Sequence, residues 1–330
     1  MRIFASLLIE PSRFPTLFWN RYRKTIKLCV SSIPRRGHTV VMVEFRYWLL
    51  QLPFEVQAAV QFPPSFSANV FRGALGTRLP RNLFSPARAQ PGPSGFVEPP
   101  RPFVLRARHL DGLSLSPGDT FYVCLHLFGR FGAQIEQAFR EAQPFHGAVR
   151  LAGTASETEV VLPLLPTEPE PGQAHIHFLT PTELKHNDTL AALPHFPILF
   201  ARASARLRTL ASFYGEPIEF DFEKLSVQSE QVEMIEHSLK HEWGERFSTR
   251  TGQTHPLGGF TGSAKYEGQL RELLPLIRAA QYTGVGRQTV WGKGEIEVAW
   301  FKPAVLSAQL SSPSHPNIEP VLPDNSARPY

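Results

Sequence analysis

The first half of the chain alternates between apolar runs typical of strands and segments whose apolar residues recur at helical spacing. The run MVEFRYWLLQLPFEVQ at 42–57 is rich in aromatic and β-branched residues and predicts a strand. Pro63 and Pro64 end this run, and the segment after them places Phe71 and Leu75 at helical spacing. The same pattern predicts strands at 42–57, 102–110, 119–129 and 157–165, helices at 65–79 and 132–145, and a Pro/Gly/Ser-rich loop at 80–101.

The second half repeats this order of elements after the Pro- and Glu-rich linker PTEPEPGQ at 166–173. Its pattern predicts strands at 174–184, 258–269 and 293–301 and helices at 192–215 and 270–281, while 231–243 fits a strand or a helix. With 231–243 as a strand, each half has the order β-α-β-β-α-β, which is the ferredoxin-like order. We therefore predict an α+β protein of two tandem ferredoxin-like (RRM-like) domains, at 42–165 and 174–301, with a glycine-rich loop near the C-terminus.

Both ends of the chain lie outside this predicted repeat. Residues 302–330 hold six prolines with scattered Ser and Asn, which is typical of a disordered tail. Residues 1–41 precede Met42, which already opens the first predicted strand. They are either a basic extension or the product of a start codon assigned too far upstream.

Charge is concentrated at the N-terminus. The net charge is +5, but residues 1–41 hold eight Lys or Arg against one acid, so the rest of the chain sums to 5 − 7 = −2. A polyanion site must therefore come from local arrangement and not from bulk charge. The two cysteines, Cys29 and Cys124, form no C-x-x-C pattern, which favours a reducing cytoplasm and argues against a thiolate metal site. No apolar window is long enough for a membrane span, and we see no signal peptide.

The most unusual local feature is a run of four glycines just before the last predicted strand. One or two glycines there would indicate ordinary turns with positive φ. Four of them, with basic residues between, indicate a loop whose backbone approaches another chain closely and whose N–H groups can cradle phosphates. The pattern is neither a P-loop nor a strand–GxGxxG–helix unit. The glycines and the basic residues of this loop are Gly284, Gly286, Gly292, Gly294, Arg287 and Lys293.

Three blocks of sequence together resemble the CRISPR-associated repeat endoribonuclease family of the RAMP superfamily, in the branch with a long C-terminal domain. The first block is VFRGALG at 70–76. The second is HFLTPTELKH at 177–186, followed by the arginine-bearing segment FARASARLRTL at 200–210. The third and most specific is the glycine-rich segment at 257–298. The resemblance covers about 42–300.

The resemblance implies a cytoplasmic protein with tandem ferredoxin-like domains that binds CRISPR repeat RNA and associates with other CRISPR effector subunits. It also implies cleavage of the precursor RNA without metal or other cofactor, by attack of a ribose 2′-hydroxyl that leaves a 2′,3′-cyclic phosphate. Such cleavage needs a base, an acid and cations near the phosphate. Two alternatives stay open: a non-catalytic RAMP-type subunit that only binds repeat RNA, and a two-domain enzyme or scaffold unrelated to RNA.

In its catalytic residues, this chain departs from the pattern of the family that it resembles. Members commonly place a catalytic histidine on or just after the first helix, and no histidine occurs between Ser65 and Arg101. We take His186, His255 and Tyr282 as candidates, against the plainer interpretations of a solvated loop histidine for His186 and a half-buried core residue for Tyr282. Proposed RNA contacts are Arg72, Lys185, Arg202, Arg206, Arg287, Lys293 and the four loop glycines; a solvated basic face is the alternative for Arg202 and Arg206.

Overall fold

The computed structural model describes residues 43–84, 86, 99–166, 171–243, 245–247, 254–256 and 258–301, with the backbone alone described at 245–247, 254–256 and 301. Four predicted features fall wholly or partly outside the described residues: the segment 1–41, the tail 302–330, residues 85 and 87–98 of the loop, and residues 167–170 of the linker.

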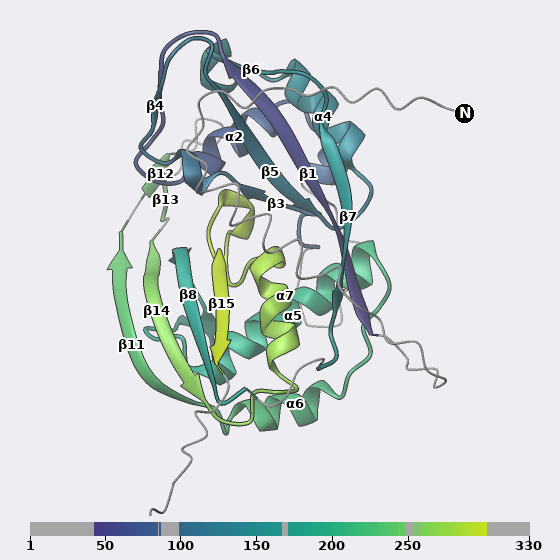
Figure 1. The fold of residues 1–330 in the computed structure, drawn as a ribbon, viewed down its shortest axis with the longest axis vertical. Coiled ribbons are helices and arrows are strands. Elements are labelled where there is room, and N and C mark those ends of the chain that lie inside the picture. Colours follow the sequence, from purple (N-terminus) through teal and green to yellow (C-terminus); the bar gives the residue numbers. More distant parts are fainter. Residues whose placement is uncertain are drawn as a thin grey trace, which may run out of the picture.

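The first half forms a five-stranded antiparallel sheet with helices on one face, and a separate two-stranded sheet of β2 and β4 (Figure 1). Its elements are β1 (Glu44–Val56), β2 (Val60–Gln61), α2 (Ser67–Leu75), α3 (Arg81–Phe84), β3 (Phe103–Arg106), η1 (Arg108–Leu110), β4 (Ser114–Leu115), β5 (Thr120–Leu127), α4 (Gly132–Glu141), η2 (Pro144–Gly147), β6 (Val149–Leu151) and β7 (Ser156–Pro163). The strand order is β3-β5-β1, and β6 and β7 both pair with the free side of β1. Buried residues alternate along β1, but the alternation changes phase at Leu49 and Leu50. The first part of the strand therefore packs on one cluster and the second part, through its opposite face, on another.

The second half forms a separate four-stranded antiparallel sheet in the order β11-β14-β8-β15. Its elements are β8 (Gln173–Thr182), β9 (Lys185–His186), β10 (Thr189–Leu190), α5 (Phe196–Tyr214), α6 (Phe222–Ser229), β11 (Glu233–Glu242), β12 (Glu245–Phe247), β13 (Thr254–Pro256), β14 (Gly259–Glu267), α7 (Leu274–Thr283), η3 (Thr289–Trp291) and β15 (Ile296–Phe301). The two sheets have equivalent strand orders: β3-β5-β1-β6 in the first half corresponds to β11-β14-β8-β15 in the second. The predicted ferredoxin-like fold class is confirmed.

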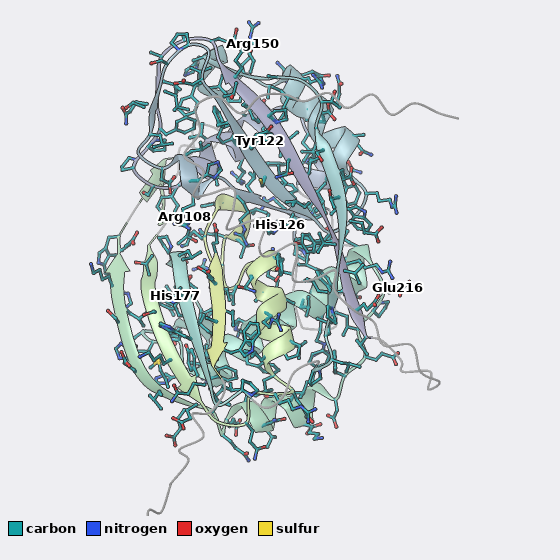
Figure 2. All side chains as sticks on the ribbon, viewed as in Figure 1. Arg108, Tyr122, His126, Arg150, His177 and Glu216 are labelled. Atoms are coloured by element: carbon teal, nitrogen blue, oxygen red, sulfur yellow. The ribbon has the colours of Figure 1, made fainter. Side chains whose placement is uncertain are left out.

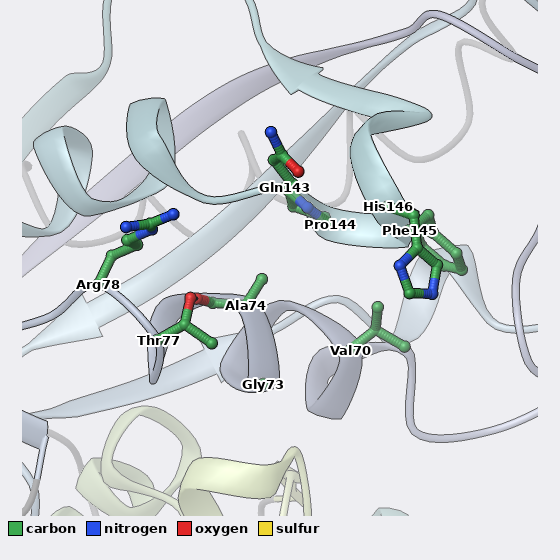
Figure 3. Close-up of a pocket in the computed structure, with 9 residues that line it drawn as sticks. All are labelled: Val70, Gly73, Ala74, Thr77, Arg78, Gln143, Pro144, Phe145 and His146. Atoms are coloured by element: carbon green, nitrogen blue, oxygen red, sulfur yellow. The ribbon is translucent and has the colours of Figure 1, made fainter. Parts of the chain in front are cut away.

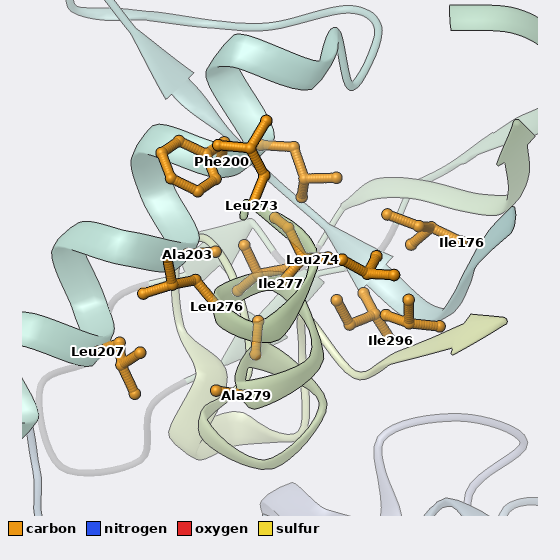
Figure 4. Packing of buried hydrophobic residues seen from close by; sticks show 14 of the residues in the cluster. Ile176, Phe200, Ala203, Leu207, Leu273, Leu274, Leu276, Ile277, Ala279 and Ile296 are labelled. Carbon is orange, nitrogen blue, oxygen red and sulfur yellow. The ribbon is translucent and has the colours of Figure 1, made fainter. Parts of the chain in front are cut away.

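One hydrophobic cluster crosses from the first half to the second. Side chains of α5 and α7 pack together and against β8 and β15, as Figure 4 shows for Phe200, Ile277 and Ile296. Phe45 and Tyr47, on the part of β1 that reaches beside these helices, belong to the same cluster. A second cluster lies in the first half, under α2 and α4, and also takes in Val290 of η3. The continuous core holds the two halves in a fixed relation.

The structure settles one open assignment and adds elements that the pattern did not predict. The segment 231–243 is the strand β11, an edge strand with most of its residues exposed. Strand β6, helix α6 and the hairpin of β9 and β10 were not predicted from the sequence. Among the described helices, none combines the length and the apolar character needed to cross a membrane.

Candidate functional site

The glycine loop (residues 284–294) connects α7 to β15 and packs closely against other parts of the backbone. Gly286 has φ of 79°, and a Cβ added there would lie 2.2 Å from the carbonyl oxygen of Glu183. Gly294 has φ of 67°, and a Cβ there would lie 1.9 Å from the carbonyl oxygen of Val285. Only glycine combines this backbone conformation with so close an approach. The close approach expected from the sequence is therefore present, but it is made to the protein itself.

Backbone N–H groups of the glycine loop donate hydrogen bonds within the protein. Arg287 donates to the carbonyl of Glu183 at 3.1 Å. Gly294 donates to the carbonyl of Pro181 at 3.2 Å. The N–H groups of Gly284, Val285, Trp291 and Gly292 also donate to backbone carbonyls. These donors are engaged within the protein, unlike the free N–H groups that the sequence led us to expect. The phosphate contact of the loop stays a prediction.

Lys293 is the buried cation of this loop. Its side chain is 0% exposed, and its ammonium lies 3.1 Å from a carboxylate oxygen of Glu183, itself 7% exposed. The ammonium also donates to the carbonyl of Gly258 at 2.6 Å and to Oε1 of Gln288 at 3.0 Å. Burial lowers the pKa of Lys293, and the charge of Glu183 opposes that shift. Lys293 therefore fixes the loop to the end of β8 and offers no exposed group to RNA.

Arg287 covers this ion pair from the solvent side. Its guanidinium lies 3.6 Å from Glu183, and its side chain is 50% exposed. Arg287 therefore keeps a face that a phosphate can reach, unlike Lys293.

Three consecutive carbonyls at the C-terminal end of α7 accept hydrogen bonds from side chains of three other elements. The C-terminal end of a helix carries partial negative charge and unpaired carbonyls, so donors and cations stabilise it. Two of the donors come from the first half of the chain, so these bonds also join the halves. The pairs are Arg106 Nη2 to Gln281 at 3.0 Å, His126 Nδ1 to Tyr282 at 2.8 Å and Arg206 Nε to Thr283 at 2.7 Å.

Arg206 was expected to contact RNA and instead caps α7. Burial, together with the nearby charge of Arg106, lowers its pKa to about 9. It remains positively charged at neutral pH, so its charge is offset by the carbonyls of α7. The carbonyl of Thr283 is thus an internal partner for Arg206. The RNA contact assigned to Arg206 stays a prediction.

The burial of His126 beside the carbonyl of Tyr282 makes the folding stability depend on pH. It is 3% exposed, and burial lowers its pKa from 6.5 to about 3, so the folded protein holds it neutral. Between pH 6.5 and 3 the unfolded chain binds a proton at this residue and the folded chain does not. Folding stability is therefore lost as pH falls through this window, by about 1.4 kcal/mol per unit.

We expect the difference in unfolding free energy between wild type and His126→Gln to shrink by about 2 kcal/mol from pH 6.5 to 5. Urea unfolding at several pH values measures it. The exposed His237→Ala on β11 is the control and should leave the pH dependence unchanged. A difference that stays constant with pH would show that His126 has the same pKa in the folded and unfolded chains, which contradicts the prediction.

The three catalytic candidates lie in different settings. Tyr282 stacks on Tyr47, with ring centroids 5.1 Å apart, at the interface of the halves, as the core interpretation expected. His186 is exposed in the β9–β10 hairpin, where its Nε2 lies 3.0 Å from the Asn187 amide. His255 belongs to β13, and its side chain lies outside the described residues. Tyr282 and His186 lie on different elements, α7 and the β9–β10 hairpin.

The remaining proposed RNA contacts differ in exposure. Arg72 is buried on α2, with its guanidinium 5.0 Å from the ring centroids of both Phe84 and Trp291. This cation–π contact joins α2 to the glycine loop. Lys185 is exposed and pairs with Asp188 at 2.6 Å. Arg202 is half-buried on α5, and its Nε has no hydrogen-bond partner among the described residues.

A hollow of about 380 Å³ lies between α2 and the η2 turn (Figure 3). We call it the α2–η2 hollow; it is lined by Val70, Gly73, Ala74, Thr77, Arg78, Gln143, Pro144, Phe145 and His146. Its lining includes one cationic side chain, Arg78, and no carboxylate. It also brings a histidine, His146, against the first helix, which the sequence leaves without one. The sequence offered no signal for His146, because its neighbours in the hollow are distant in the chain.

A second cleft of about 370 Å³ lies where the two halves meet. Arg108 lines it together with three acids, Asp111, Glu242 and Glu295. Figure 2 shows Arg108 at the level where the halves meet. The acids make this cleft unfavourable for a polyanion. Within the described part of the chain, no three His, Cys, Asp or Glu side chains are grouped as metal ligands would be.

Comparisons with known proteins agree with this architecture. The family model for the CRISPR-associated endoribonuclease Cas6 matches residues 176–296. No curated protein matches the chain. A Cas6 product complex from Thermus thermophilus is 19% identical, with 77% of this chain and 100% of that chain covered and a TM-score of 0.50.

Two further solved structures have the same fold. A second Cas6 product complex is 16% identical, covers 77% of this chain and 100% of that chain, and has a TM-score of 0.50. A chain of a partial Cas6-RT-Cas1–Cas2 complex is 12% identical over 79% of this chain and 47% of that chain, with a TM-score of 0.51. The resemblance to the Cas6 family found in the sequence is thereby confirmed: residues 176–296 match the family's own model, within a fold that solved Cas6 structures share.

Proposed function

We propose that this protein is an endoribonuclease that cuts CRISPR precursor RNA within the repeat and so produces the mature guide RNA. The observation that carries the proposal is the match of residues 176–296, which include the glycine loop, to the Cas6 family model. The ferredoxin-like sheet order in both halves supports it. We further propose a cytoplasmic location and association with other CRISPR effector subunits.

The proposed chemistry is attack of the ribose 2′-hydroxyl on the adjacent phosphate, without metal, to leave a 2′,3′-cyclic phosphate. A base takes the 2′-proton and cations stabilise the charge on phosphorus in the transition state. Arg287, Lys185 and Arg202 are the proposed RNA contacts that keep exposed or half-exposed side chains. Their spread over the second half suits contact with the repeat backbone.

The test is a cleavage assay with the full chain and RNA of the repeats encoded beside its gene, in EDTA. We expect one cut per repeat, a 2′,3′-cyclic phosphate on the upstream product and a 5′-hydroxyl on the other. A repeat with a single 2′-deoxy nucleotide at the cut site should bind with unchanged affinity and stay intact, because the nucleophile is missing. Cleavage that requires Mg²⁺ would overturn the proposed chemistry.

A non-catalytic subunit that only binds repeat RNA is the second candidate. The absence of histidine between Ser65 and Arg101, where the first helix lies, favours it. Tight binding of the repeat with no cleavage of the all-ribose RNA would establish this candidate and exclude the first. Failure to bind any repeat would exclude both.

A further inference from the structure

We propose that the α2–η2 hollow is the place where the RNA strand is cut, with His146 as the base and Arg78 as a phosphate contact. This inference rests on the proposed function. It does not use His186, His255 or Tyr282.

The backbone at η2 is held in an unfavourable conformation that aims His146. Phe145 (φ 51°, ψ 41°) and His146 (φ 55°, ψ 33°) are both left-handed, and Gly147 follows with φ of 89°. Residues with a Cβ adopt this conformation rarely, and two in succession are rarer still. Such strain gathers at functional sites, where the surrounding structure enforces it.

Packing in the first half enforces this turn. The ring of Phe145 lies against Phe62, with centroids 4.9 Å apart in an edge-on arrangement. Phe62 is fully buried, so the contact anchors Phe145 in the core. His146, the next residue, is exposed and its ring lies over α2 near Val70 (Figure 3). The strained turn thus packs one side chain against the core and presents the next to the hollow.

The floor of the hollow is made by small residues on α2. A Cβ placed on Gly73 would meet no atom within 4 Å, and Ala74 follows it. The outer surface of α2 is therefore open to a ligand at this point. The volume of about 380 Å³ is within the range of small-molecule sites.

Charge distinguishes this hollow from the cleft between the halves. The α2–η2 hollow has Arg78 and no carboxylate in its lining. The cleft has three acids and one arginine. A phosphate is attracted to the first and repelled from the second. Both hollows have similar size, so charge decides between them.

The spacing of His146 and Arg78 defines how the strand lies. His146 lies beside Val70 on one side of the hollow, and Arg78 lies on the other, beyond the C-terminal end of α2 (Figure 3). We therefore assign them to neighbouring positions on the strand. A strand lying along α2 places the reacting ribose at His146 and a neighbouring phosphate at Arg78, with Thr77 and Gln143 between them as hydrogen-bonding side chains.

In the proposed step an unprotonated ring nitrogen of His146 takes the proton of the 2′-hydroxyl. The 2′-oxygen forms a bond to phosphorus as the bond from phosphorus to the 5′-oxygen breaks. The 5′-oxygen takes a proton from water, and His146 returns its proton to solvent. The products are the 2′,3′-cyclic phosphate and a 5′-hydroxyl.

The deciding variant is His146→Asn, because Asn tolerates the left-handed conformation and cannot act as the base. We expect single-turnover cleavage to slow by about 100-fold or more, with repeat affinity unchanged within about twofold. The limb of the pH–rate profile due to the base should also be lost. Arg78→Ala should raise the KM for repeat RNA, as loss of a phosphate contact does.

Two further variants separate catalysis from folding. His146→Gly relieves the left-handed strain, so its melting temperature should equal or exceed that of wild type while cleavage is lost. His237→Ala, an exposed histidine on β11, should cleave normally. Wild-type rates in both His146 variants would overturn the assignment of the base, and an unchanged KM in Arg78→Ala would overturn the phosphate contact. A wild-type protein that cuts no repeat would instead refute the proposed function.

Discussion

Replacement of Lys293 by Met is expected to lower the free energy of unfolding by about 3 kcal/mol, because it leaves Glu183 buried without its main partner. Lys293 is 0% exposed, and its ammonium is the group closest to the Glu183 carboxylate. Arg287 remains 3.6 Å away but is half exposed, so it compensates only in part. The substitution also removes the donor to the carbonyl of Gly258. Urea unfolding at pH 7 measures the loss.

A double-mutant cycle separates the ion pair from simple packing. Lys293→Met combined with Glu183→Gln removes both charges and should be less destabilising than the sum of the single changes, by at least about 1 kcal/mol. The matched control is Lys265→Met, which breaks the exposed pair with Glu236 and should cost under about 1 kcal/mol. Equal losses for Lys293→Met and Lys265→Met would mean that the buried pair does not anchor the loop.

The strands and helices of both halves follow from periodicity because most of them bury a single face. β8 buries every second residue over most of its length, and its pattern predicts it cleanly. β11 is an edge strand with exposed residues on both faces, so its sequence fits a helix as well. Helix α6 is short and is capped by the side chain of Asp221, a local signal that its weak apolar pattern obscured. Periodicity therefore predicts the elements that bury one face in the core.

The sequence indicates that the basic residues of the site need anions, but it cannot say where these come from. The anion beside Lys293 is Glu183, which lies on another element. The partner of Arg206 is the carbonyl end of α7. In both cases the cation has a partner inside the chain, where the sequence pattern suggested RNA. The partner of each cation lies on a distant segment of the chain, and a single sequence does not reveal such contacts.

Gly294→Ala is expected to destabilise the protein by about 3–4 kcal/mol and to displace the glycine loop. Its left-handed φ of 67° costs an alanine about 1–2 kcal/mol. The new Cβ would lie 1.9 Å from the carbonyl oxygen of Val285, so the two segments must separate. That separation breaks the bonds from Val285 N–H to Gly294 and from Gly294 N–H to Pro181, each contributing about 1 kcal/mol.

Gly118→Ala isolates the conformational part of this loss. Gly118 also has positive φ, 89°, but a Cβ there would meet no atom within 4 Å, so only the backbone cost of about 1–2 kcal/mol applies. The difference between the two variants measures the close approach alone. Equal losses would mean that the glycine loop has room for a side chain at Gly294. A larger loss for Gly294→Ala would show that the glycines before β15 are needed to let the loop pack against the backbone around it.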